Sequence, residues 1–251
     1  MLNRDRIVSQ LNNEKHERGL ILGDCTDSTN LKVKEMAQQG AAEGVTMIVD
    51  RQTGGRGRLG RQFHSPEGGL YLSTLLRPTD PNPGHITCRA AVAAARAIES
   101  LCDAKIDIKW VNDLYLNGRK VAGILAEGVL SPDGTLAAVV LGIGINVGVT
   151  EFPDELKPIA TSLGNEGFTL SREDVAAAFL NGLTQTLCAD ASVMDEYRRR
   201  NLVLGRQVTV LQGKEAYPAT AEAITDEGHL TVRDADGHTY TLSSGEVSIR
   251  L

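Results

Sequence analysis

The 251-residue sequence lacks the features that mark several classes of protein. No apolar run approaches the ~20 residues that a membrane-spanning helix needs, so we expect no membrane segment. The chain has 26 basic residues (Lys and Arg) against 32 acidic ones, and the net charge of −6 argues against a protein that coats nucleic acid through overall charge. Aromatic residues make up only 4%, whereas an arginine–glycine tract that binds RNA is longer and interleaved with aromatic side chains.

Cysteine pairs and a leader segment are also missing. The four cysteines stand far apart, at Cys25, Cys88, Cys102 and Cys188, and the five histidines form no cluster. A zinc site or a disulfide framework needs closer spacing, so we expect reduced thiols. Residues 1–6 are polar and supply no signal-peptide core. We therefore predict a cytoplasmic protein.

What remains is an ordinary globular composition, with 41% hydrophobic and 23% charged residues in a chain long enough for one large or two modest domains. Ser171 precedes apolar residues at helical spacing and is a predicted helix cap, and Asn117-Gly118 is a strong hairpin signal. We expect helices over 31–39, 88–101, 171–187 and 193–200, and strands over 45–49, 70–76, 114–116, 120–127 and 136–147.

The pattern changes after Gly205. Turn residues there separate five expected short strands, over 208–211, 219–224, 230–232, 240–242 and 247–249. Strands at this close spacing suggest a small β-barrel appended to an α+β domain. We therefore predict two domains, residues 1–202 and residues 203–251.

The segment Gly54–Arg61 combines four glycines with three arginines. Glycine allows close backbone approach and arginine supplies permanently charged donor forks, a combination suited to a clamp over phosphates. A solvated basic turn is the alternative. A dinucleotide-binding fold would need a helix directly after the loop, which the turn-rich run 61–69 cannot form. No Walker Gly-Lys-Ser/Thr occurs, and the other motifs of a protein kinase are absent.

Lys109 is the second candidate. It alternates with Ile108 and Trp110, so it shares a strand face with Asp107 and Val111. An exposed lysine and a lysine that projects into a pocket fit this position equally well.

Other polar residues have two interpretations as well. Ser28, Thr29 and Asn30 are typical helix caps, yet a helix N-terminus can also bind a polar ligand. Asn146 ends an apolar strand and is ambiguous in the same way. For Gly142-Ile-Gly144 we favour close strand packing, because no helix follows it.

Taken together, these segments resemble the biotin protein ligases. Six motifs occur in the family's order, and the C-terminal Gly245–Arg250 resembles the end of its C-terminal barrel. The motifs are Asp27–Asn30, Gly55–Arg61, Ser65–Ser73, Lys109–Leu116, Arg119–Leu125 with Glu127, and Gly142–Val147.

The resemblance implies an α+β fold, with a mixed or antiparallel sheet flanked by helices as in class II aminoacyl-tRNA synthetases, and a small C-terminal SH3-like β-barrel. It implies an ATP-dependent ligase that makes biotinyl-5'-AMP and transfers biotin to a lysine of a biotin carboxyl carrier protein, with Mg²⁺ on the phosphates. It implies neither a nucleic-acid nor a membrane partner, and it leaves room for a homodimer.

The resemblance also assigns roles to residues. Lys109 and Arg58 are the expected catalytic residues. Biotin contacts are expected from Ser28, Thr29, Asn30, Gln52, Arg56, Gly57, Arg58 and Lys109. Nucleotide contacts are expected from Arg56, Arg58, Arg61, Phe63, Lys109 and Asn146. The metal ligands stay unassigned.

Two positions depart from the family pattern: Val111 stands where proline is usual, and Phe63 where tryptophan is frequent. No helix-turn-helix segment precedes the catalytic region, so no operator-binding role is expected. The alternatives are a lipoate- or octanoate-protein ligase of the same fold and a nucleic-acid binder that uses the arginine loop.

Overall fold

The larger part of the protein is built on a mixed sheet. The computed structural model describes residues 2–78, 82–212, 215–243 and 247–248. Within them, seven strands are ordered β1-β2-β3-β7-β6-β5-β4, with β1 and β2 parallel and every other pair antiparallel. The strands are β1 (Leu20–Thr26), β2 (Thr46–Gln52), β3 (Leu70–Leu76), β4 (Asp107–Lys109), β5 (Asp113–Leu116), β6 (Arg119–Leu130) and β7 (Leu136–Ile145). The predicted mixed sheet is confirmed.

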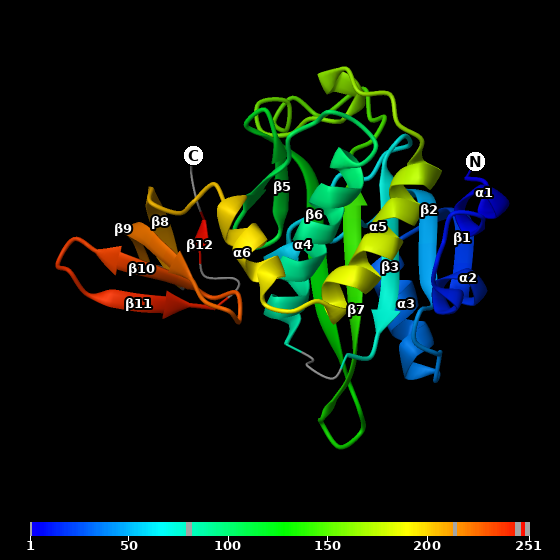
Figure 1. The fold of residues 1–251 in the computed structure, drawn as a ribbon, viewed down its shortest axis with the longest axis horizontal. Coiled ribbons are helices and arrows are strands. Elements are labelled where there is room, and N and C mark those ends of the chain that lie inside the picture. Colours follow the sequence, from blue (N-terminus) through cyan, green and yellow to red (C-terminus); the bar gives the residue numbers. More distant parts are fainter. Residues whose placement is uncertain (1, 79–81, 213–214, 244–246, 249–251) are drawn as a thin grey trace.

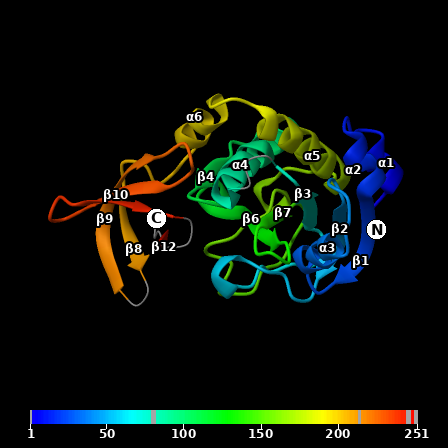
Figure 2. The ribbon, with the colours of Figure 1, turned by 90° about the horizontal axis from the view of Figure 1, so that it is seen from below.

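Helices cover the two faces of this sheet unequally. The helices are α1 (Arg4–Val8), α2 (Glu14–Gly19), α3 (Thr29–Gln38), α4 (Pro83–Glu99), α5 (Arg172–Cys188) and α6 (Ser192–Arg199). The long helices α4 and α5 cover one face, and α3 lies on the other (Figures 1 and 2). Five alanines of α4 are fully buried, which brings that helix close to the sheet: Ala90, Ala91, Ala93, Ala94 and Ala95. On the opposite face, Val33 and Ala37 of α3 pack with Leu75 and Val140.

Local signals set most element boundaries. Asn117 and Gly118 both have positive φ, 51° and 77°, and join β5 to β6 as predicted. The Ser171 side chain accepts the backbone N–H of Asp174 and caps α5. Helix α4 begins five residues before the expected start because the Asn82 side chain accepts the N–H groups of Gly84 and His85.

The face predicted for Lys109 needs one correction. Strand β4 ends at Lys109, and the following Trp110–Val111 peptide bond is cis. Val111 is 1% exposed and belongs to the main hydrophobic core, so it does not share the face of Lys109. The predicted alternation of buried and pocket-facing side chains therefore holds as far as Trp110 and fails at Val111.

The C-terminal part forms a second, antiparallel sheet. Its described strands are β8 (Gln207–Gln212), β9 (Glu215–Ile224), β10 (Leu230–Asp234), β11 (Thr239–Leu242) and β12 (Val247–Ser248), in the order β11-β10-β9-β8-β12. It lies beside α6, at the left of Figure 1. The predicted SH3-like domain is confirmed. Of the motif Gly245–Arg250, only Val247 and Ser248 lie within the described residues.

Two further expectations from composition can be compared with the structure. All four cysteines are free thiols. In the described part of the chain, no helix combines the length and the apolar character that a membrane crossing requires.

Candidate active site

A pocket of about 180 Å³ lies on the face of the large sheet that α3 covers. All but one of the residues predicted for the site line it: Ser28, Thr29, Asn30, Gln52, Arg56, Gly57, Arg58, Arg61, Phe63 and Lys109. They come from the start of α3, the end of β2, the glycine–arginine loop and the end of β4. Segments far apart in sequence, such as 28–30 and 109, therefore meet at one cavity.

Asn146 is the exception. It is 4% exposed and does not line the pocket, and its Nδ2 donates to the carbonyl of Thr161 at 3.0 Å. Its Oδ1 has no hydrogen-bond partner among the described residues. A role beside the nucleotide stays a prediction for this residue.

Glycines in the central strand β7 make the floor of the pocket. A Cβ on Gly142 would lie 1.9 Å from Oδ1 of Asn30, and one on Gly144 would lie 2.4 Å from the ring of Phe63. Real Cβ atoms do not approach other atoms this closely. The glycines thus serve close packing, as the sequence suggested, but the groups packed on them are two side chains of the pocket itself.

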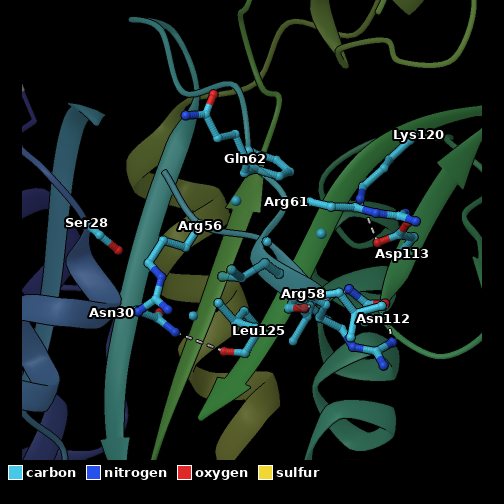
Figure 3. Close-up of a pocket in the computed structure, with 18 of the residues that line it drawn as sticks. Ser28, Asn30, Arg56, Arg58, Arg61, Gln62, Asn112, Asp113, Lys120 and Leu125 are labelled. Atoms are coloured by element: carbon cyan, nitrogen blue, oxygen red, sulfur yellow. Dashed lines mark hydrogen bonds and ion pairs between the residues drawn. The ribbon is translucent and has the colours of Figure 1, made fainter. Parts of the chain in front are cut away.

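One end of the pocket is polar and uncharged. Oε1 of Gln52 accepts both the backbone N–H and the hydroxyl of Thr29, at 2.8 and 3.1 Å, and its Nε2 donates to Ser65 at 3.0 Å. Ser28 is 1% exposed, makes no side-chain cap bond to α3 and points into the pocket (Figure 3). Short donors and acceptors fixed in this way suit a small, rigid polar group.

The side chain of Asn30 forms hydrogen bonds with other groups of the protein. Its Nδ2 donates to Glu127 at 2.9 Å and to the carbonyl of Leu125 at 3.3 Å, and its Oδ1 lies 2.6 Å from the hydroxyl of Ser73. Glu127 in turn forms an ion pair with Arg56 at 3.4 Å. Asn30 therefore joins α3 to β6 beside the arginine loop (Figure 3), and its predicted contact with biotin stays a prediction.

The other end of the pocket is strongly cationic. Arg58 and Arg61 enter from the loop, and Lys109 and Lys120 come from β4 and β6. Arg56, from the same loop, lies beside Asn30 (Figure 3). Nη1 of Arg58 donates to Oδ1 of Asn112 at 3.1 Å. Among the described lining residues, Asp113 is the only acidic side chain, and it forms an ion pair with Lys120 at 2.7 Å. The pocket of an acidic protein thus concentrates positive charge, which attracts anions.

Burial affects two of these cations. It lowers the pKa of Lys109, with Asp113 acting in the opposite direction, and it lowers the pKa of the Arg58 guanidinium. An arginine side chain is effectively always protonated in proteins, so Arg58 keeps its charge at neutral pH. A charge removed from water interacts more strongly with a bound anion than an exposed charge does.

The glycine–arginine loop folds back on itself. The N–H of Gly57 donates to the carbonyl of Arg61 at 2.7 Å, and the N–H of Phe63 donates to that of Gly55 at 2.9 Å. Leu59 lies at the tip with φ of 56° and 72% exposure. As expected, no helix follows the loop, and an extended segment leads into β3.

Lys120, Asn112 and Asp113 line the site but were not predicted from the sequence. The register of the paired strands β4, β5 and β6 is what identifies Lys120 as a residue of the site. Strand pairing places Lys109 opposite Asp113, and Tyr115 opposite Lys120. Since directly paired and alternate residues share a face, these four side chains lie on the pocket side of the sheet.

Comparison with known proteins agrees with this geometry. The model of the biotin/lipoate A/B protein ligase family matches residues 22–146, and the model of the biotin protein ligase C-terminal domain matches residues 203–250. The chain is 35% identical to the biotin–[acetyl-CoA-carboxylase] ligase of Mycobacterium tuberculosis, over 88% of this chain and 85% of that protein. It is 42% identical to the bifunctional ligase/repressor BirA of Bacillus subtilis over 64% of this chain, a match that spans about half (51%) of that relative.

Solved structures show the same fold. Biotin protein ligase from Aquifex aeolicus in complex with biotin and ATP superposes with a TM-score of 0.81 at 32% identity, over 93% of this chain and 99% of that one. Fold, site geometry and sequence identity over most of the chain thus agree, and the chain belongs to the biotin protein ligases of the biotin/lipoate A/B protein ligase family.

Proposed function

We propose that the protein joins biotin to a lysine of a biotin carboxyl carrier protein in two steps, with ATP as the activating substrate. The observation that carries the proposal is one pocket whose lining combines uncharged polar side chains with five cations. Biotin has the matching shape, a ureido ring at one end and a carboxylate at the other. The Aquifex ligase holds biotin and ATP, and the mycobacterial relative is named for its carboxylase substrate, which supports this choice.

In the first step a carboxylate oxygen of biotin attacks the α-phosphorus of ATP. The new O–P bond forms as the bond to the β-phosphate breaks, which gives biotinyl-5'-AMP and pyrophosphate. Two anions must meet, and negative charge grows on the non-bridging oxygens. Arg56, Arg58, Lys109 and Lys120 offset that charge from fixed positions around the pocket.

In the second step the amine of the carrier lysine attacks the acyl carbon. An amide bond forms, the bond to the phosphate oxygen breaks, AMP leaves, and the amine loses a proton. The acyl-adenylate is an activated anhydride, so water must be excluded until the carrier docks. The loop Gly54–Arg61, with Arg58 bound to Asn112, closes one side of the pocket.

The remaining roles follow the chemistry of the two ends. Ser28, Thr29 and Gln52 would hydrogen-bond the ureido ring, and Phe63, packed over Gly144, would stack on adenine. Mg²⁺ binds nucleotides chiefly through phosphate oxygens and water with one or two carboxylates, and it would supply further positive charge. Asp113, the acidic side chain of the described pocket lining, would be the residue to contact it, although it is paired with Lys120 in this structure.

The test is incubation with biotin, labelled ATP and a biotin carrier domain. We expect AMP release together with a biotinylated carrier lysine. The family description includes lipoate ligases, so calorimetric titration with lipoate is the comparison. Tight binding of lipoate without binding of biotin would refute the proposal.

Arg58→Gly should release the adenylate before transfer. The substitution removes the bond to Asn112 and a guanidinium at the phosphate. Hydrogen bonds to charged groups contribute about 1.5–3 kcal/mol, so dissociation of biotinyl-5'-AMP should become about 10- to 100-fold faster. The measurement is a streptavidin blot of serum albumin added as a bystander. Arg51→Gly is the control because Arg51 is exposed and outside the pocket lining, and equal labelling by both variants would contradict the prediction.

A further inference from the structure

The cationic end of the pocket depends on the segment Lys109–Asp113, which connects β4 to β5. Lys109 and Asp113 line the pocket, and Asn112 binds Arg58 through Oδ1 and donates its Nδ2 to the carbonyl of Ile124 at 2.9 Å. A displacement of this segment would therefore move a lysine, a carboxylate and the partner of an arginine together.

Trp110 and Val111, within this segment, are held by groups from the C-terminal part of the chain. The indole N–H of Trp110 donates to the carbonyl of Gly228 at 2.9 Å, in the turn between β9 and β10. Gly228 has φ of 83°, and a Cβ there would lie 2.7 Å from Sγ of Cys88, so the turn packs closely on α4. The carbonyl of Val111 accepts the hydroxyl of Tyr197, a residue of α6, at 2.9 Å.

Helix α6 links these two attachments. The residue after Tyr197, Arg198, donates to the carbonyl of Ile224 at 2.7 Å and forms an ion pair with Asp226. Tyr197 is fully buried, and burial raises its pKa well above 10, so the phenol stays protonated and remains a donor. The charge of Arg58 acts against that rise in pKa.

We propose that Tyr197 is a positioning residue for adenylate formation. Its hydroxyl, donated to the carbonyl of Val111, fixes Lys109–Asp113 and through it Lys109 and the Arg58–Asn112 contact. The phenol lies outside the pocket lining, so it is not placed to contact a ligand bound there. The catalytic half of this inference rests on the proposed function. The other half, that the Tyr197 hydroxyl anchors the segment Lys109–Asp113, does not depend on the reaction and is measured separately by the fluorescence of Trp110.

Tyr197→Phe removes the hydroxyl and keeps the ring. We expect kcat for biotin-dependent ATP–pyrophosphate exchange to fall about tenfold, the effect of losing one buried hydrogen bond from the arrangement of the reacting groups. KM for biotin should change less than kcat, because α3 and β2 supply the uncharged polar side chains of the pocket and Tyr197 does not hold them. Trp110 is the single tryptophan of the chain and 5% exposed, so its fluorescence should shift to the red and be quenched more strongly by acrylamide.

Val175→Ala is the control for a purely structural role. Val175 is buried in α5, which packs on α1, α4 and β3. It should lower Tm without changing kcat or the Trp110 signal. The proposal is overturned if Tyr197→Phe leaves the Trp110 signal unchanged, or if its kcat falls no more than that of the control. A wild-type chain without exchange activity would refute the proposed function alone, and the Trp110 signal would then decide the anchoring.

Discussion

Lys120→Ala should lower the rate of biotin-dependent ATP–pyrophosphate exchange by about 10²- to 10³-fold, the typical effect of removing one fixed group that stabilises transition-state charge. The Lys120 Nζ lies close to Gly123 of β6, which lines the pocket, because a Cβ on that glycine would be 3.1 Å from it. It is also 5.7 Å from the ring centre of Phe63. In the proposed reaction, an ammonium in this place would offset negative charge on the reacting oxygens.

Lys109→Ala should also abolish or greatly reduce adenylate formation while the fold persists, since Lys109 lies on the pocket side of β4 at its cationic end. Lys157→Ala is the matched control, because that lysine is 62% exposed and paired with Asp154 outside the pocket. Circular dichroism would establish that each variant is folded. Wild-type exchange in Lys120→Ala or in Lys109→Ala would remove that residue from the mechanism.

Features coded by short stretches of sequence could be predicted closely. Strand β3 spans Leu70–Leu76, as its apolar run indicates, and Asn117-Gly118 forms the expected hairpin. These elements depend on neighbours within a few residues, so the sequence contains all the information they need. The glycine–arginine loop could be identified for the same reason, since its unusual composition is itself the signal.

The pairing of distant segments could not be predicted in the same way. Lys120 appears in sequence as an ordinary lysine after a hairpin, and only the register of β4, β5 and β6 places it beside Asp113. In the sequence, Val111 continues the alternation of apolar and polar residues. The strand ends before it, however, and its side chain is buried in the hydrophobic core. The contact of Trp110 with Gly228 joins residues more than a hundred positions apart. No local pattern predicts such a contact.

Gly142→Ala should eliminate biotin binding and destabilise the fold, although it adds a single methyl group. The new Cβ would lie 1.9 Å from Oδ1 of Asn30, so Asn30 must move and give up its bonds to Ser73 and Glu127. Overpacking of this kind costs about 1–3 kcal/mol of stability. Since Ser73 also contacts Thr29 at 2.7 Å, the polar end of the pocket would shift as well. Calorimetric titration with biotin and thermal unfolding measure the two effects.

A second substitution can separate this steric cause from a general intolerance of the strand. Gly142→Ala combined with Asn30→Ala removes the atom that the methyl group would meet, so Tm should recover, while the lost bond to Glu127 leaves Arg56 less constrained. Gly23→Ala is the control, because its Cβ would meet the nearest side chain at 3.5 Å, an ordinary contact. If the double variant stayed as unstable as Gly142→Ala, the clash with Asn30 would not be the cause. Recovery of Tm without recovery of biotin affinity would instead indicate that the glycine floor and Asn30 shape the pocket together.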